Sequence, residues 1–90
     1  MAEKRLTQAQ LQKRLSDAVA KVQVGGIYRH YKNKLYQVVG VALMEATNET
    51  CVIYQAQYGT HATFIRTLSN WLETVEVNGT KTRRFTLLTN

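Results

Sequence analysis

The sequence contains no proline, a single cysteine and no long apolar run. With only Cys51, the chain cannot build an internal disulfide framework, so a reducing compartment and a small buried thiol are the simpler expectation. A membrane-spanning helix needs about eighteen apolar residues in a row, and a secretory leader needs an apolar core that the charged N-terminus lacks. We therefore expect a cytoplasmic protein that does not enter a membrane.

Positive charge is abundant but not concentrated in one part of the chain. Twelve Lys and Arg residues against six Asp and Glu give a formal net charge of +6 at pH 7. Residues 1–24 hold five cations and two acids, or +3, and residues 25–90 hold seven and four, also +3. A basic protein favours an anionic partner, but nucleic-acid binding needs cations gathered on one face. Weak, non-specific nucleic-acid binding is therefore kept as an alternative function.

Residues 1–24 have the pattern of an amphipathic helix. Thr7 is the expected N-cap, Gln10 is its capping-box partner, and Gly25-Gly26 is expected to end the helix with a left-handed C-cap. The apolar positions between them recur at helical spacing: Leu11, Leu15, Ala18, Val19 and Val22. A helix this short is not stable alone, so we expect it to pack on the rest of the domain. Pairing of two copies through this helix, which would give a homodimer, is left open.

From residue 25 onward the apolar residues alternate, which is typical of strands. Strands are expected over residues 27–32, 35–43, 50–57, 62–66, 72–77 and 82–87. Gly40 predicts a bulge, residues 68–71 predict one helical turn, and Asn78-Gly79 predicts a type I′ hairpin turn. The fold class is therefore mainly β (α+β): a small antiparallel barrel of five to six strands over residues 25–90, with the N-terminal amphipathic helix as a separate segment.

The segment Ile27–Lys32 combines aromatic rings with cations. In a strand, Tyr28 and His30 point to one face and Arg29 and Tyr31 to the other, so either His30 or Arg29 lies close to buried surface. One interpretation is a structural strand whose tyrosine rings fill the barrel. The other is a ligand pocket, in which arginines hold an anion and tyrosines stack on a planar group. The residues predicted to line that pocket are Arg29, His30, Tyr31, Tyr54, Tyr58 and Arg66.

Catalysis has weaker support in the sequence. His30 could serve as an acid–base group, which keeps a small enzyme as a further alternative, but no serine or cysteine lies in a nucleophile motif. His30, His61 and Cys51 are too scattered for the usual metal-ligand spacing. We therefore assign no catalytic residue, metal or cofactor, and expect a binding module whose partner is an unidentified anionic ligand or macromolecule.

The order of several motifs resembles a bacterial family of short proteins, the domain of unknown function sixteen fifty-three. The matching motifs are Gly26-x-Tyr28-Arg29-His30-Tyr31-Lys32, Tyr36-x-Val38-x-Gly40-Val41-Ala42, Glu45-x-Thr47, Val52-x-Tyr54, Tyr58-Gly59, Arg66, Glu73-x-Val75 and Arg84-Phe85. The resemblance implies a compact, mostly β bacterial domain that is similar to an SH3-like barrel and has no established activity. Phe64 stands where the family often has tryptophan. Because the resemblance retains both Arg29 and Arg66, we expect these two guanidinium groups to converge on one anion.

Overall fold

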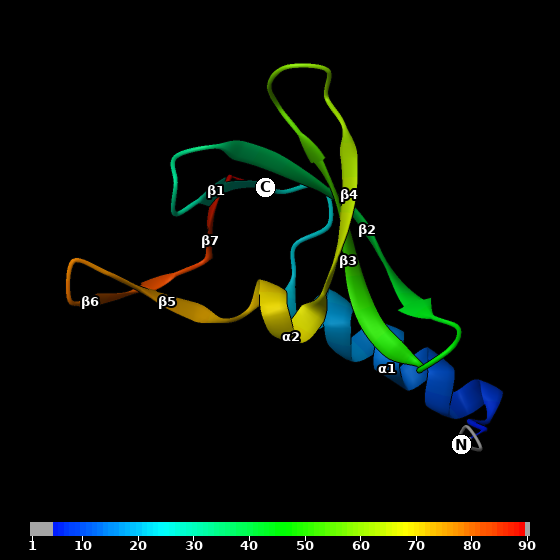
Figure 1. Cartoon of the computed structure of the whole chain (residues 1–90). Coiled ribbons are helices and arrows are strands. Elements are labelled where there is room, and N and C mark those ends of the chain that lie inside the picture. The colour runs from blue at the N-terminus through cyan, green and yellow to red at the C-terminus, as the bar shows by residue number, and fades with distance from the viewer. Residues whose placement is uncertain (1–4, 90) are drawn as a thin grey trace.

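The computed structural model describes residues 5–89 of the chain. Within that range two helices and seven strands follow one another (Figure 1). In chain order they are α1 (Gln8–Lys21), β1 (Ile27–His30), β2 (Leu35–Met44), β3 (Glu49–Ala56), β4 (Thr63–Thr67), α2 (Leu68–Trp71), β5 (Thr74–Val77), β6 (Thr80–Arg83) and β7 (Phe85–Thr89).

Five strands form one antiparallel sheet in the order β4-β3-β2-β1-β7, and β5 and β6 form a separate two-stranded sheet. In Figure 1 the β5–β6 hairpin projects away from the larger sheet. The prediction of a mostly antiparallel β domain with one N-terminal helix is confirmed. The curved five-stranded sheet, with β4 and β7 at its edges, is compatible with a small barrel-like fold.

The bulge predicted at Gly40 is confirmed by the pairing of β2 with β3. Val38 pairs with Tyr54 and Gly40 pairs with Ile53, so the register shifts between these two positions of β2. One extra residue on a strand bends it and increases its twist. The bulge therefore helps the long strand β2 to curve around the core.

The chain leaves one sheet and joins the other at Arg84, where the sequence predicted a single strand over residues 82–87. That prediction is wrong, because β6 pairs with β5 whereas β7 pairs with β1. The Arg84 N–H donates to the Glu73 carbonyl at 3.1 Å, and the Arg84 carbonyl accepts the Tyr31 N–H at 3.0 Å. Both backbone groups of Arg84 are thus used to fix the crossing point.

The hairpin turn at Asn78-Gly79 is confirmed in its predicted type. Asn78 has φ of 52° and Gly79 has φ of 80°. Two successive positive φ angles define a type I′ turn, which matches the twist of the flanking strands.

Helix α1 begins as predicted. Gln10 N–H donates to Thr7 Oγ1 at 3.1 Å, and Thr7 N–H donates to Gln10 Oε1 at 2.8 Å, which completes the capping box. Its end is different, because Val22 is the C-cap in an extended conformation and Gly25, with φ of +87°, lies in the turn that follows. The predicted glycine C-cap is therefore wrong.

The predicted packing of α1 on the β domain is confirmed. Ala18 and Val22 are buried, and α1 contacts β2 and β3. Arg14 Nη1 also donates to the Asn48 carbonyl at 2.6 Å, which ties the helix to the β2–β3 connection. Val19, which the sequence assigned to the same apolar stripe, is 51% exposed, so the buried stripe is narrower than predicted.

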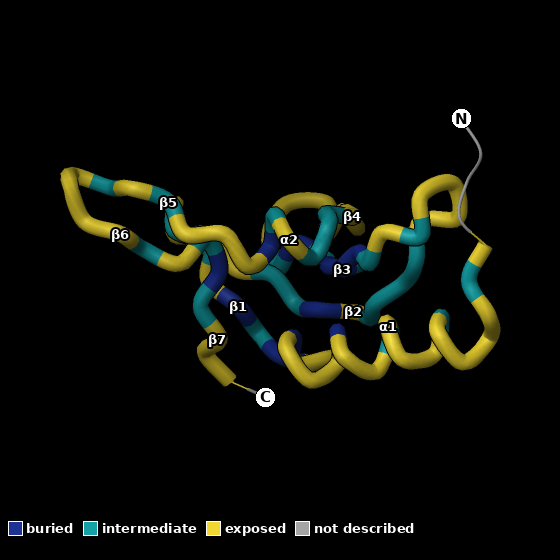
Figure 2. The backbone as a smooth tube through the Cα atoms, turned by 90° about the horizontal axis from the view of Figure 1, so that it is seen from below, coloured by how far each residue is buried: buried dark blue, intermediate teal, exposed yellow. Residues whose placement is uncertain are grey.

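The core lies between the sheet, α1 and α2, as the buried positions in Figure 2 show. Its members are Val22, Tyr28, Val38, Val52, Tyr54, Trp71 and Phe85. Trp71 from α2 stacks on Phe85 from β7 with 3.7 Å between ring centroids and 7° between planes. Cys51 is buried as expected, and burial raises the pKa of its thiol. No helix within residues 5–89 is long and apolar enough to cross a membrane.

Candidate functional site

One face of the five-stranded sheet, which we call the inner face, carries the core and a group of aromatic residues that includes two core members, Tyr54 and Phe85. Cross-strand pairing aligns His30 with Phe85 and Tyr54 with Phe64, so these four side chains share that face. Tyr36 pairs with Tyr28 and lies on the same face. We call this group the aromatic cluster: His30, Tyr36, Tyr54, Phe64 and Phe85.

The rings of the aromatic cluster contact one another mostly edge to face. Tyr36 lies 5.3 Å from Tyr54 and 6.0 Å from Phe85, and His30 lies 5.0 Å from Phe85, measured between ring centroids. Edge-to-face geometry places positive ring edges against negative ring faces, which is the favoured arrangement. The cluster is therefore a preorganised aromatic surface, and Phe64, 44% exposed, lies at its rim.

Arg66 projects from β4 into the aromatic cluster. Its Nε donates to Tyr54 Oη at 3.1 Å and its Nη1 donates to Asn70 Oδ1. The guanidinium carbon lies 5.3 Å from the centroid of Phe85 and 5.9 Å from that of Tyr54, within the range of cation–π attraction. Within residues 5–89, Arg66 forms no ion pair with a carboxylate. Among these described residues, its hydrogen-bond partners are the neutral side chains of Tyr54 and Asn70.

A second arginine, Arg84, is connected to this region through its ion pair with Glu73. Arg84 Nη2 lies 2.8 Å from Glu73 Oε1, and Asn70 Nδ2 donates to that same oxygen at 3.4 Å. Arg66, Asn70, Glu73 and Arg84 thus form one chain of polar contacts. The buried Nε of Arg84 has no hydrogen-bond partner within residues 5–89. The network therefore contains two guanidinium groups and one carboxylate.

His30 lies beside this network and is affected by it. Burial is the main cause that lowers the pKa of His30, and the positive charges of Arg66, Arg84 and Lys32 lower it further. His30 Nδ1 accepts the Lys32 backbone N–H at 3.1 Å, so we assign the proton of the neutral imidazole to Nε2. At neutral pH His30 is thus a neutral hydrogen-bond donor.

Tyr36 and Tyr58 share a hydrogen bond between their hydroxyl groups at 2.6 Å. Burial, followed by this hydrogen bond, raises the pKa of Tyr36 to about 12. Tyr58 is 39% exposed and Lys34 Nζ lies 4.8 Å from the centroid of its ring. Tyr58 therefore extends the aromatic surface from Tyr36 toward solvent.

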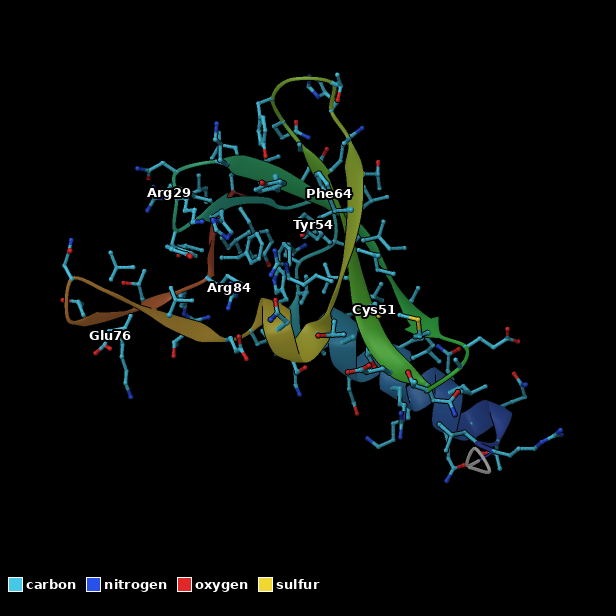
Figure 3. The ribbon with its side chains drawn as sticks, in the orientation of Figure 1. Arg29, Cys51, Tyr54, Phe64, Glu76 and Arg84 are labelled. Atoms are coloured by element: carbon cyan, nitrogen blue, oxygen red, sulfur yellow. The ribbon has the colours of Figure 1, made fainter. Side chains whose placement is uncertain are left out.

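The structure separates Arg29 from the other residues predicted for the pocket. Arg29 pairs with Leu35 and Thr86, is exposed, and points to the outer face, because Tyr28 and His30 on either side point inward. In Figure 3, Arg29 lies at the periphery of the molecule, whereas Tyr54 and Phe64 lie over the curved sheet. The predicted convergence of Arg29 with Arg66 is wrong, because strand alternation sends the two side chains to opposite faces.

The other predicted residues are connected through ring contacts and hydrogen bonds. Tyr54 and Arg66 are bonded directly, and Tyr31 lies 4.5 Å from His30 between ring centroids. His30 contacts Phe85, and Tyr58 joins through Tyr36. The structure thus brings together five of the six residues: His30, Tyr31, Tyr54, Tyr58 and Arg66.

Sequence reasoning left Arg84, Asn70 and Glu73 out of the predicted pocket. Arg84 was missed because a single strand was expected over residues 82–87. An alternating pattern does not reveal where the chain crosses from one sheet to the other. Glu73 and Arg84 both occurred in the motifs that suggested the family resemblance. A charged pair of opposite sign among those motifs was the available signal for this network.

Comparisons with known proteins agree with the motifs. The family described as "Protein of unknown function (DUF1653)" matches residues 26–87. A crystal structure of a DUF1653 protein from Bordetella bronchiseptica is 31% identical, with a TM-score of 0.68 over 77% of this chain and 91% of that chain. A search of curated proteins finds no match. The chain belongs to the DUF1653 family.

Proposed function

We propose that this protein is a binding module that accepts an anionic group at Arg66, with His30 and Arg84 beside it and the aromatic cluster as the adjoining wall. The observation that carries this proposal is the environment of Arg66. Its guanidinium is partly buried and bonded to two neutral oxygens, those of Tyr54 and Asn70. A guanidinium with neutral partners keeps its full charge and further N–H donors for a ligand.

Two neighbouring groups favour an anion over a neutral ligand. The neutral His30 can offer Nε2–H as a donor, and Arg84 places a second guanidinium nearby in its ion pair with Glu73. Hydrogen bonds from charged donors to an anion are about twice as strong as neutral ones. A carboxylate or phosphate group is therefore the chemistry that this arrangement favours.

The rings beside Arg66 suit a ligand with a planar part next to its charge. Phe64 and Tyr58 are partly exposed at the rim of the aromatic cluster. Flat apolar faces of this kind stack on aromatic or heteroaromatic groups. The anionic ligand that fits best carries such a group next to its carboxylate or phosphate.

The proposal is tested by calorimetric titration with inorganic pyrophosphate at low ionic strength. Binding to Arg66→Gln should be at least about tenfold weaker than binding to the wild type, because a charged donor is lost. Arg29→Gln is the matched control, since it removes the same charge from the outer face of the same sheet. Arg66→Lys should also bind more weakly while the fold stays cooperative, because lysine lacks the planar fork.

Equal weakening by Arg29→Gln and Arg66→Gln would contradict an anion site at Arg66. It would favour weak, non-specific nucleic-acid binding, in which dispersed cations contribute alike and affinity falls steeply with salt. A titration with a single-stranded oligonucleotide at two salt concentrations separates the two functions. Within residues 5–89 the imidazole of His30 accepts the backbone N–H of Lys32, a contact that gives the enzyme alternative no specific support.

A further inference from the structure

A cavity that Arg66 does not line lies where the end of α1 meets α2 and β7. Its volume is about 190 Å³. Two of its walls are the stacked rings of Trp71 and Phe85, which come from different elements. The side chains of Leu72 and Leu87 also line it, and each is partly exposed to solvent. The cavity is therefore a slot with two aromatic walls, two leucine side chains and an open side.

The polar groups around this cavity are donors. Lys21 reaches it from the end of α1 and Arg83 from β6. The ion pairs within residues 5–89 are Lys13–Asp17 and Arg84–Glu73, so neither lining cation is neutralised by a carboxylate there. The cavity thus combines apolar walls with two positive charges that lack a described counter-ion.

Tyr28 adds a third polar group to the lining of the cavity. Its side chain is 6% exposed, and its hydroxyl oxygen accepts the Gln23 N–H at 2.9 Å. The hydroxyl proton has no acceptor within the described residues. A buried hydroxyl that already accepts one hydrogen bond is left with a donor to offer, and an acidic ligand would supply the acceptor.

We propose that this cavity binds a small amphipathic acid, a single aromatic ring that carries one carboxylate. The volume suits a ligand of this size, because an apolar protein cavity of about 150 Å³ is known to hold benzene. The ring would lie against Trp71 and Phe85, and the carboxylate would face Lys21 and Arg83. Arg66, Arg84 and His30 do not line this cavity, so the inference does not depend on the proposed function.

The test uses phenylacetate as the probe and the indole N–H of Trp71 as the reporter in ¹H–¹⁵N NMR spectra. Trp71 is the one tryptophan of the sequence, so its indole signal is unambiguous. Phenylacetate should shift this signal saturably with a Kd of about 1 mM or tighter, as expected for so small a ligand. Acetate should leave it unshifted, and benzyl alcohol should bind at least about tenfold more weakly, because it lacks the charge.

Two single-charge variants on one hairpin give the matched control. Arg83→Gln should weaken phenylacetate binding about tenfold. Lys81→Gln removes a charge from the same strand at a residue that does not line the cavity, so this variant should bind phenylacetate as the wild type does. The absence of a saturable shift, equally tight binding of benzyl alcohol, or equal weakening by Lys81→Gln would each overturn the inference.

Discussion

The two faces of the five-stranded sheet carry similar residue types in different environments. On the inner face, Arg66 is bonded to Tyr54 and lies over an aromatic ring, whereas Arg29 on the outer face is exposed. Aliphatic residues differ in the same way. Val52, which pairs with Arg66 on the inner face, is 0% exposed, whereas Ile65, which pairs with Ile53 on the outer face, is 57% exposed. The role of a residue in this protein therefore follows from which face the strand alternation gives it.

The largest expected difference in stability is between a substitution in the core and a substitution on the outer face of the sheet. Trp71→Ala should lower the free energy of unfolding by about 3–5 kcal/mol, because it removes the ring that stacks on Phe85. Ile65→Ala should change it by no more than about 0.5 kcal/mol, the scale of a surface substitution. Urea denaturation of both variants measures the difference, and similar losses would contradict the assignment of the two faces.

The same comparison applies to the two sides of α1. Val22→Ala should cost about 2 kcal/mol because Val22 is buried in the core cluster. Val19→Ala should cost less than about 0.5 kcal/mol, and Leu15→Ala should fall between them because Leu15 is half-buried. If chemical denaturation gives Val19→Ala the larger cost, the side of the helix that contacts the sheet has been misassigned.

Two glycines extend the comparison to the addition of a single methyl group, the change from Gly to Ala. A Cβ at Gly26 would lie 2.8 Å from Leu87 Cδ1 and 3.1 Å from the Gln23 carbonyl oxygen, whereas a Cβ at Gly40 has nothing within 4 Å. Gly26→Ala should therefore destabilise the fold by about 1–2 kcal/mol through overpacking. Gly40→Ala meets no such contact and should be nearly neutral. Thermal unfolding of both variants checks this, and equal stability of the two would show that the neighbours of Gly26 move aside freely.

A smaller, pH-dependent effect is expected from Tyr36. Its folded pKa of about 12 lies above the ordinary value of 10.0, so the folded state favours the protonated phenol. The stability that this preference provides is present below pH 10 and is lost as pH rises through about 12. Tyr36→Phe should flatten the stability profile in this range. A variant that loses stability as steeply as the wild type would show that another group is responsible.

Local signals in the sequence predicted most of the secondary structure. The Thr7–Gln10 capping box, the bulge at Gly40 and the Asn78-Gly79 turn depend on residues close in sequence, and all three were predicted. The end of α1 and the position at Arg84 where the chain crosses between the two sheets were not predicted. Both depend on backbone contacts with residues that are distant in sequence. The Arg84 carbonyl, for example, accepts the Tyr31 N–H.

The candidate site, too, could be predicted only in part from the sequence. Residue types and family motifs indicated five of the residues that come together, but whether Arg29 joins them depended on which face of β1 meets the core. Both faces of residues 27–32 mix aromatic and charged side chains, so their composition could not decide it. The decision is made by the burial of Tyr28 against Trp71, whose ring centroids are 5.2 Å apart.

The most direct test of the inner-face site is the pKa of His30, measured by NMR titration of its imidazole. In the wild type it should lie below 6.5, because burial and the charges of Arg66 and Arg84 favour the neutral form. Arg66→Gln should raise this pKa, Arg29→Gln should leave it unchanged, and saturating pyrophosphate should raise it in the wild type, because a bound anion favours the imidazolium. An equal response to both arginine substitutions, or a His30 pKa that pyrophosphate does not move, would contradict an anion site built on the inner face.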